Sequence, residues 1–446
     1  MNIHFIAIGG SIMHSLAIEL KSNGHHITGS DDVIYDPAKS NLQSHNLLPN
    51  QYGWNPKNIT TELDMIILGM HAKEDNPELI EAKNKNIVIL SFPEFIFKYA
   101  ESKKRIVITG SHGKTTITGM ILHVLHDNNI KTDYLLGAKI DLLDKQVSLS
   151  NSNLMIIEGD EYYSSAIDLT PKFMHYNPDI LVVSGVSWDH VNVFPTLVSY
   201  QNAFKNILQQ VIVSSGKIFY CNNDNFLSSF LKTTPSVNSY SLPEYVVENG
   251  KFNLINNEQK IPLQIFGKHN LYNMQAAKHV CNELGVSDQN FFSSIKKFKG
   301  VSRRLTLIKN LNNHSSVYYD FAHSPSKVLA TVSAVRELNP DRYLLACFEL
   351  YTFSSLNIDF IPNYANVFSE CDEVWIYIAD TTLKLKGLQN INEKFINNAI
   401  NHQKLLLIKD KSELSNRLIN LQLFKTNLLM MSSGNFSGLN MGSIFK

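Results

Sequence analysis

Short apolar runs alternate with longer stretches of helical periodicity along the whole chain. Apolar runs of this length, bounded by glycine and polar residues, are typical of strands buried on both faces of a sheet. Strands that alternate with helices favour parallel sheets covered by helices. The hydrophobic pattern therefore predicts an α/β protein.

The predicted elements fall into three sections. At 446 residues the chain is too long for one hydrophobic core, so we expect domains at residues 1–102, 103–299 and 300–446. A helix is predicted around residues 360–368. Strands are predicted at residues 3–8, 26–28, 63–68, 87–90, 105–109, 154–157, 180–186, 217–220, 316–320, 343–349, 373–378, 405–408 and 427–431.

The first section has the layout of a nucleotide-binding βαβ unit. Its first strand ends in Gly9-Gly10, and its second strand ends near Asp31, about twenty residues later. An acidic residue at that spacing binds a ribose or a base in such units, and we expect Asp31 to do so. The glycine pattern is incomplete, because the third glycine of G-x-G-x-x-G is missing.

The second section opens on a phosphate-binding loop. A strand at 105–109 leads into Gly110-Ser-His-Gly113-Lys114-Thr115 and then into a helix. The helix directs free N–H groups and its positive dipole end at the loop, Lys114 reaches phosphate oxygens, and the Thr115 hydroxyl can bind Mg²⁺. Ile108 stands where the usual G-x-x-x-x-G-K-[ST] pattern has glycine, so this is a shorter form.

Glu158 and His190 each follow the C-terminal end of a predicted strand, at the sheet edge where ligands collect. With Thr115 they are candidate ligands for two Mg²⁺ ions beside the terminal phosphate of ATP. An imidazole ligand suggests that one site tolerates Mn²⁺. Alternatively, Glu158 is a solvated carboxylate and His190 a helix-cap partner.

Further polar residues begin predicted helices in the second half of the chain. Asn270 and Asn273 either hydrogen-bond to the edge of an adenine base or cap a helix. Asp320 either binds ribose hydroxyls or caps the next helix, and His323 can approach phosphate. Arg304 is placed to link the third section to the phosphates of the second.

Composition narrows the class of protein. The 40 basic and 40 acidic side chains balance, so nucleic-acid binding gains no electrostatic support. No apolar run approaches the roughly 18 residues of a membrane span. The first residues lack the basic start and cleavage site of a signal peptide, and the four cysteines stand far apart. We therefore expect a cytoplasmic protein without membrane insertion, disulfides or structural zinc.

Seven motifs occur in order across nearly the whole chain. They are Ile-Ala-Ile-Gly-Gly-Ser-Ile-Met, Thr-Gly-Ser-His-Gly-Lys-Thr-Thr, Glu-Gly-Asp-Glu-Tyr, Trp-Asp-His, Gly-Lys-His-Asn-Leu-Tyr-Asn, Arg-Arg-Leu and Asp-Phe-Ala-His-Ser-Pro. Together they resemble the Mur ligases, the ATP-dependent amide-bond-forming enzymes of peptidoglycan synthesis. The resemblance implies an N-terminal Rossmann-like domain for a UDP-sugar, a central P-loop ATPase domain with a parallel sheet, and a C-terminal Rossmann-like domain.

The resemblance also implies roles for single residues. The implied UDP-sugar contacts are Gly9, Gly10, Ser11, Asp31 and His71. The implied ATP contacts are Gly110, Ser111, His112, Gly113, Lys114, Thr115, Thr116, Asn270, Asn273, Arg304, Asp320 and His323. The implied catalytic residues are Lys114, His190 and Arg304, and the implied metal ligands are Thr115, Glu158 and His190.

Within the family, four segments resemble the member type that recycles murein. They are the uninterrupted Gly-Gly-Ser-Ile-Met turn, Glu-Gly-Asp-Glu-Tyr162, Pro171-Lys-Phe-Met-His-Tyr and the segment 320–327. That type joins UDP-N-acetylmuramate to the tripeptide L-alanyl-γ-D-glutamyl-meso-diaminopimelate, and we expect a monomer or weak dimer. The nearest alternative adds L-alanine to the same acceptor. More distant alternatives are a folate-polyglutamylating ligase and a nucleotide-driven switch.

Three positions depart from the family pattern. Phe204 stands where several relatives carry a carbamylated lysine, so Glu158 and His190 would hold the second ion without it. Tyr163 stands where an acidic residue is common, and the segment 377–382 has no functional interpretation.

Overall fold

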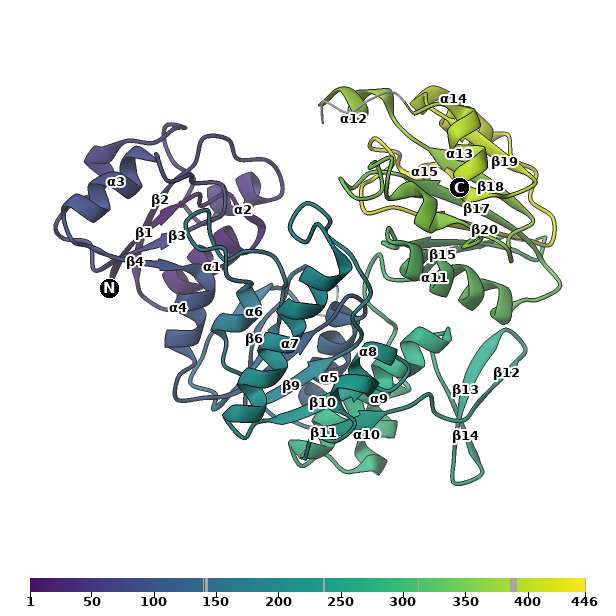
Figure 1. Cartoon of the computed structure of the whole chain (residues 1–446), viewed down its shortest axis with the longest axis horizontal. Coiled ribbons are helices and arrows are strands. Elements are labelled where there is room, and N and C mark those ends of the chain that lie inside the picture. The colour runs from purple at the N-terminus through teal and green to yellow at the C-terminus, as the bar shows by residue number, and fades with distance from the viewer. Residues whose placement is uncertain (139, 141–142, 236, 312, 386–390, 446) are drawn as a thin grey trace. The chain divides into compact units, whose positions relative to one another are not determined.

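The computed structural model describes residues 1–446 except 139, 141–142, 236, 312, 386–390 and 446. It confirms the α/β class, with sheets built mainly from parallel strands (Figure 1). The described residues divide into two compact units. Unit 1 contains Met1–Val186, Val198–Ser241 and Ala276–Asn290, and unit 2 contains Ser187–Leu197, Leu242–Gln275 and Phe291–Lys446. The three domain boundaries stay a prediction.

Unit 1 begins with a parallel sheet in the order β2-β1-β3-β4. Its strands are β1 (Asn2–Ile6), β2 (His26–Ser30), β3 (Met65–Leu68) and β4 (Val88–Ser91). The helices of this part are α1 (Ser11–Ser22), α2 (Ala38–Ser44), α3 (Pro77–Asn84) and α4 (Phe92–Tyr99), with a 3₁₀ turn at Pro56–Asn58. Parallel pairing of Ile6 with Ser30 brings the ends of β1 and β2 together, which places Asp31 beside the Gly9-Gly10 turn.

The second sheet of unit 1 has the order β11-β10-β9-β5-β8-β6-β7. It is parallel except where β6 pairs with β7. Its strands are β5 (Lys104–Thr109), β6 (Asp133–Leu135), β7 (Val147–Ser148), β8 (Leu154–Glu158), β9 (Ile180–Val183), β10 (Lys217–Cys221) and β11 (Val237–Tyr240). The loop after the central strand β5 therefore lies between the ends of β8 and β9, its two neighbours.

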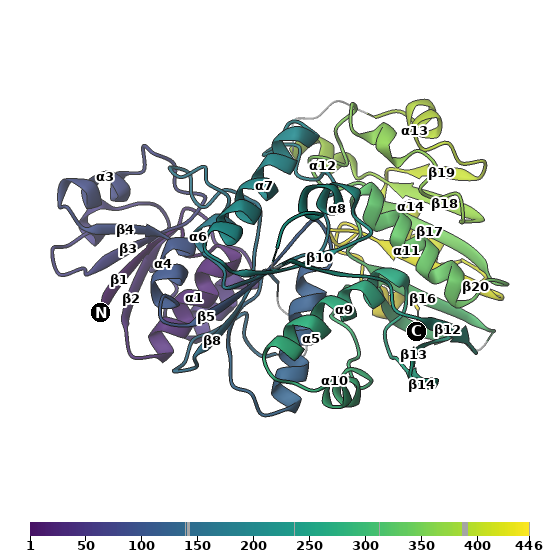
Figure 2. The same cartoon turned by 60° about the horizontal axis from the view of Figure 1, so that its bottom comes forward.

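Helices complete this part of the chain. They are α5 (Lys114–Asp127), α6 (Lys172–His175), α7 (Leu197–Val213), α8 (Asn225–Leu231), α9 (Lys268–Glu283) and α10 (Asp288–Ile295), and the residues of α9 and of α10 are divided between the two units. Helix α5 packs against β5 and β8 (Figure 2), and most of its residues are buried. This packing holds the first turn of α5 at the edge of the sheet.

Unit 2 contains a sheet in the order β15-β16-β20-β17-β18-β19, parallel except between β15 and β16. Its strands are β15 (Thr306–Leu311), β16 (Ser315–Asp320), β17 (Tyr343–Glu349), β18 (Glu373–Tyr377), β19 (Leu405–Ile408) and β20 (Thr426–Met431). Its helices are α11 (Pro325–Leu338), α12 (Asp380–Leu385), α13 (Glu393–Ile400), α14 (Lys411–Ile419) and α15 (Met441–Ile444). Every residue of β20 is buried, which explains its uninterrupted apolar run.

The structure corrects two expectations about elements and adds a sheet that was not predicted. The helix expected around residues 360–368 is only a 3₁₀ turn at Ile361–Tyr364, because Asn366 takes a positive φ and the chain turns away. The strand expected over 180–186 ends at Val183, because the chain bends at Gly185. An antiparallel sheet was not predicted, and its strands are β12 (Tyr245–Glu248), β13 (Lys251–Asn256) and β14 (Gln259–Pro262).

Within the part of the chain that the structure describes, no helix has the length and apolar character needed to cross a bilayer.

Candidate active site

The phosphate loop depends on two glycines with positive φ. Gly110 has φ +123°, and a side chain there would collide with Ser184 Oγ. Gly113 has φ +73° at the N-cap of α5, a conformation that other residues adopt only with strain. The loop is held in place because the Ser111 N–H donates to the carbonyl of Gly185, at 2.9 Å. These constraints leave the backbone between β5 and α5 tightly folded.

Lys114, the first residue of α5, is held across this loop. Its Nζ donates to the carbonyl of Gly110 at 2.7 Å and to Glu161 Oε2 at 2.8 Å. Burial would lower the pKa of Lys114, but the charges of Glu161, Asp160 and Glu158 outweigh it and raise the pKa. Lys114 therefore stays charged in a place suited to bind phosphate.

Glu161 is a functional candidate that the sequence reasoning missed. Its side chain is fully buried, and its Oε1 accepts from the Tyr200 hydroxyl at 3.2 Å. The Tyr200 oxygen also lies 3.1 Å from Ser111 Oγ, so Glu161 connects Lys114 to α7 and to the loop. The available signal was the spacing of two carboxylates in Glu158-Gly-Asp-Glu161.

Thr115 and Glu158 are brought into direct contact. The Thr115 hydroxyl donates to Glu158 Oε1 at 2.8 Å, and the Gly137 N–H donates to Glu158 Oε2 at 2.9 Å. Only 8% of Glu158 is exposed, so it is not the solvated carboxylate of the alternative interpretation. A hydroxyl and a carboxylate oxygen at this separation fit the hard-oxygen environment that Mg²⁺ prefers.

Phe204 explains the departure from the family pattern. It is fully buried, and its ring centroid lies 5.1 Å from that of Tyr200 and 5.3 Å from that of Phe173. This position therefore contributes apolar packing behind the site.

A cavity of about 240 Å³ connects this site with the turn after β1. Residues near both sheets of unit 1 line this cavity, among them Gly10, Ser11, His71, Gly137, Glu158 and Lys172. Three of the predicted UDP-sugar contacts therefore face the same space as a predicted metal ligand. Lys172 lines it too, with Nζ 2.6 Å from Asp160 Oδ2.

Asp31 holds the turn in place from behind. It is buried, and its two oxygens accept from the N–H groups of Gly9 at 2.7 Å and Asp32 at 3.0 Å. A side chain at Gly9 would meet Asp31 Oδ2 at 2.9 Å, so the glycine permits this contact. Burial raises the pKa of Asp31, the Gly9 hydrogen bond and His71 lower it, and the nearby Asp32 raises it; together they bring this pKa to about 6.

This shift predicts a pH-dependent contribution of Asp31 to stability. Between its ordinary pKa of 3.8 and about 6, the folded state keeps a proton that the unfolded state releases. Asp31 should therefore lower the free energy of unfolding by about 1.4 kcal/mol per pH unit as the pH rises through that window. The free energy of unfolding of Asp31→Asn, taken relative to wild type, should therefore rise with pH across this window. Above about pH 6 the difference between the two proteins should stay constant.

Urea unfolding of both proteins from about pH 4 to about pH 7 measures this slope. Any pH-independent effect of the asparagine side chain on the free energy of unfolding shifts the whole curve and leaves its slope unchanged. Parallel pH curves for the two proteins would contradict the shifted pKa.

In unit 2, Asp189 organises a charged cluster next to His190. Its Oδ2 lies 3.0 Å from Lys327 Nζ and 3.6 Å from His323 Nε2. Burial would raise the pKa of Asp189, but Lys327 and His323 hold it well below its usual range. The Asp189 carboxylate also accepts from the His190 N–H at 2.8 Å, and His190 has φ +55°. Asp189 and Lys327, which were not predicted as site residues, thus position the His190 loop.

The structure decides against capping at three predicted nucleotide contacts. Asn270 Nδ2 donates to the carbonyl of Phe266, and Asn273 Nδ2 donates to Asn270 Oδ1, whereas a cap would accept from a backbone N–H. Asp320 accepts from the Leu305 N–H at 3.0 Å and from the Thr331 hydroxyl. The N-cap of α11 is Ser324.

Arg303 and Arg304 flank the ring of Phe321. The guanidinium carbon of Arg304 lies 4.3 Å from the ring centroid, and that of Arg303 lies 5.4 Å away. Stacking leaves the edge of a guanidinium group able to bind phosphate.

The predicted residues are divided between the two units. Unit 1 holds the loop from Gly110 to Thr116 together with Glu158, and unit 2 holds His190, Asn270, Asn273, Arg304, Asp320 and His323. Their cooperation in one site stays a prediction.

Comparison with known proteins gives a consistent family. The family model described as "Mur ligase family, catalytic domain" matches residues 2–104, and "Mur ligase middle domain" matches residues 108–281.

Among curated proteins, the chain is 28% identical to a UDP-N-acetylmuramate–L-alanyl-γ-D-glutamyl-meso-2,6-diaminoheptandioate ligase of Haemophilus influenzae, over 75% of this chain and 76% of that protein. It is 29% identical to a UDP-N-acetylmuramate–L-alanine ligase of Clostridium botulinum, over 84% of this chain and 82% of that protein.

Among solved structures, the UDP-N-acetylmuramate–alanine ligase of Thermotoga maritima shares the fold with a TM-score of 0.72 at 20% identity, over 98% of this chain and 96% of that chain. The two matching family models and these relatives agree with the motifs, the phosphate loop and the parallel sheets. The chain therefore belongs to the Mur ligase family, whose members are ATP-dependent amide-bond-forming ligases.

Proposed function

We propose that this ligase joins the carboxylate of UDP-N-acetylmuramate to the amine of L-alanyl-γ-D-glutamyl-meso-diaminopimelate, the reaction that returns a murein tripeptide to peptidoglycan synthesis. The assignment of UDP-N-acetylmuramate as the acceptor rests on one observation, the cavity that both the Gly10-Ser11 turn and Glu158 line. A sugar nucleotide bound at that turn would extend its carboxylate toward the phosphate loop. Both curated relatives described above also have UDP-N-acetylmuramate in their names.

The proposed chemistry has two steps. A carboxylate oxygen of the acceptor attacks the γ-phosphorus of ATP, the bond to the β-phosphate oxygen breaks, and ADP leaves. The amine nitrogen then attacks the carbonyl carbon of the acyl phosphate, the amine loses a proton, and inorganic phosphate leaves. Lys114 neutralises charge on the transferred phosphate, and the α5 N-terminus orients it. Alignment and charge neutralisation supply most of the catalysis in such transfers.

The contact between Thr115 and Glu158 fits Mg²⁺, since both donors are hard oxygens and Glu158 is held by Gly137. Bound there, Mg²⁺ would neutralise charge on the phosphate oxygens of ATP. His190 is the proposed third ligand. Within unit 2, Asp189 and Lys327 hold the loop that carries His190.

The tripeptide is favoured over L-alanine by the residues of two segments, Pro171–Tyr176 and Asp320–Lys327. The L-alanine ligase is the second candidate, because relatives with that name are 29% identical to this chain. Both candidates share the acceptor and the site in unit 1, so the amine alone separates them.

Phosphate release with ATP and UDP-N-acetylmuramate tests the proposal when tripeptide and L-alanine are supplied separately. We expect turnover with the tripeptide and at least about tenfold lower kcat/KM with L-alanine, because the longer amine offers more binding energy to the transition state. Turnover with L-alanine but not with tripeptide would select the second candidate. Turnover with neither would contradict the acceptor assignment.

A further inference from the structure

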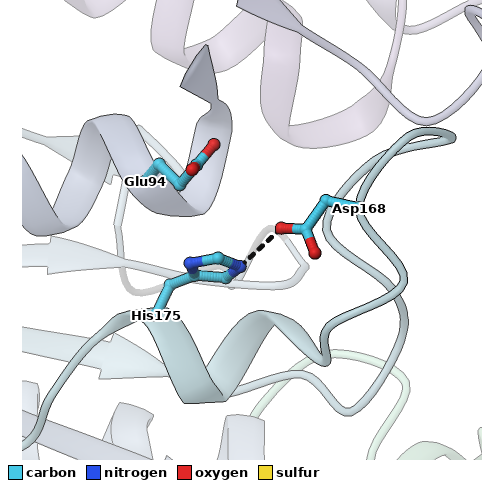
Figure 3. A group of neighbouring side chains, drawn as sticks. All are labelled: Glu94, Asp168 and His175. Carbon is cyan, nitrogen blue, oxygen red and sulfur yellow. Dashed lines mark ion pairs between the residues drawn. The ribbon is translucent and has the colours of Figure 1, made fainter.

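A second group of metal-binding side chains lies in unit 1, apart from the phosphate loop. Figure 3 shows Asp168 of the loop before α6 and His175 of α6 facing each other, with Glu94 of α4 beside them. Each offers one ligand atom, and these atoms lie within 4.8 Å of one another. All three side chains are half-buried.

The two carboxylates are each fixed through one oxygen. Glu94 Oε2 accepts from the N–H of Ser91 at 2.7 Å and from its hydroxyl at 2.8 Å, as part of the capping box that starts α4. Asp168 Oδ1 accepts from the Thr170 N–H at 2.9 Å. Supporting hydrogen bonds of this kind orient the ligands of metal sites, and they leave the second oxygen of each carboxylate for another partner.

His175 supplies a buried nitrogen to the same point. Its Nε2 lies 2.8 Å from Asp168 Oδ2. Among the described residues, however, this buried atom has no partner with the direction of a hydrogen bond. The imidazole nitrogen and the carboxylate oxygen form an ion pair at this distance when His175 is protonated, and a metal ion can take the place of that proton with both atoms as its ligands.

We propose that Glu94, Asp168 and His175 bind a divalent transition-metal ion, with Zn²⁺ as the best fit. One imidazole and two carboxylates are typical zinc ligands, whereas Mg²⁺ prefers oxygen alone. Three protein ligands leave a coordination position for water. A surface cavity of about 490 Å³ lined by Glu94 and His175 gives an ion access to the site.

The position of this site gives the ion a structural role. Glu94 lies two residues from Phe92, and His175 lies next to Tyr176, and both aromatic residues line the cavity proposed for the acceptor. Helix α4 also contacts α6 directly. A bound ion would fix one wall of that cavity by joining α4 to α6. The metal site itself does not depend on the proposed function.

Calorimetric titration of the full chain with ZnCl₂, in excess Mg²⁺ and without nucleotide, tests the proposal. Glu94→Gln is the most informative variant, because a glutamine can keep the capping box through its amide oxygen while it removes the charged ligand. We expect Glu94→Gln and His175→Gln to weaken zinc binding by at least about tenfold, or to abolish it. His45→Gln, which changes an exposed histidine of the same unit, is the matched control and should bind zinc as the wild type does.

Thermal melting provides a second readout that does not need activity. Zinc should raise the melting temperature of the wild type and of His45→Gln, but not that of the two site variants. Without zinc, Glu94→Gln should melt close to wild type, which shows that it folds. Equal zinc affinity in all four proteins, or no zinc binding by the wild type, would overturn the proposal.

Discussion

Replacing Lys114 with methionine is expected to reduce ADP formation by at least about 100- to 1000-fold, the cost of removing one well-placed charge-stabilising group. The reason is geometric as well as electrostatic. Lys114 Nζ is held by the Gly110 carbonyl and by Glu161 at the start of α5, so its charge is fixed at this loop position. Steady-state assays of ADP release with saturating ATP and acceptor measure the loss.

The same substitution is expected to destabilise the fold. Glu161 is fully buried, and without Lys114 its charge loses its partner, which costs about 3–5 kcal/mol when such a pair is broken from one side. The double variant Lys114→Met/Glu161→Gln removes both charges, so it should recover most of the unfolding free energy but not the activity. This separates the role in catalysis from the role in folding.

Lys217→Met is the matched control for Lys114→Met. Lys217 also pairs with a glutamate, at 2.6 Å from Glu283, but both side chains are partly exposed. Its loss should cost less than about 1 kcal/mol and leave turnover unchanged. Near-normal ADP formation by Lys114→Met would show that the phosphate loop is assigned wrongly.

Glu158→Gln is expected to raise the Mg²⁺ concentration needed for half-maximal rate by at least about tenfold. The glutamine oxygen can still accept from the Gly137 N–H, so the local fold should persist. Its amide group, however, carries no charge and would face Thr115 as a poor metal ligand. Single-turnover formation of ADP should slow, whereas binding of UDP-N-acetylmuramate, measured by calorimetry, should change little.

Glu81→Gln is the control for this prediction, since Glu81 forms a partly exposed pair with Lys85 on α3. Its Mg²⁺ dependence should match that of the wild type. If Glu158→Gln shows the same Mg²⁺ dependence as Glu81→Gln, Glu158 is not a metal ligand.

The local parts of the site could be predicted because local residues determine them. A β-branched run, two glycines and a helix in that order predicted the loop from β5 to α5, and the structure has it at Gly110–Thr115. Strands β17 and β19 have the predicted bounds, because each is a continuous apolar run between polar residues. The prediction of a helix around residues 360–368 was wrong. The apolar side chains of this segment are buried as expected, but a 3₁₀ turn and further turns place them in the core instead of a helix.

Partners distant in sequence could not be predicted. The hydrogen bond between Asp31 and the turn after β1 was not predicted, and it forms because parallel pairing aligns the ends of β1 and β2. The expected ligand contact of Asp31 stays a prediction. The strands β12–β14 were missed because many of their residues are only half-buried and leave a weak apolar pattern.

The sequence by itself determined the α/β class, the phosphate loop and the family, since these depend on neighbouring residues and on motif order. Only the tertiary structure decided which charges meet. Lys114 pairs with Glu161 across 47 positions, and Asp189 pairs with Lys327 across 138. The physical reason is that hydrophobic burial sets the order of the strands, and strand order then brings remote loops to one sheet edge, where buried charges must find partners.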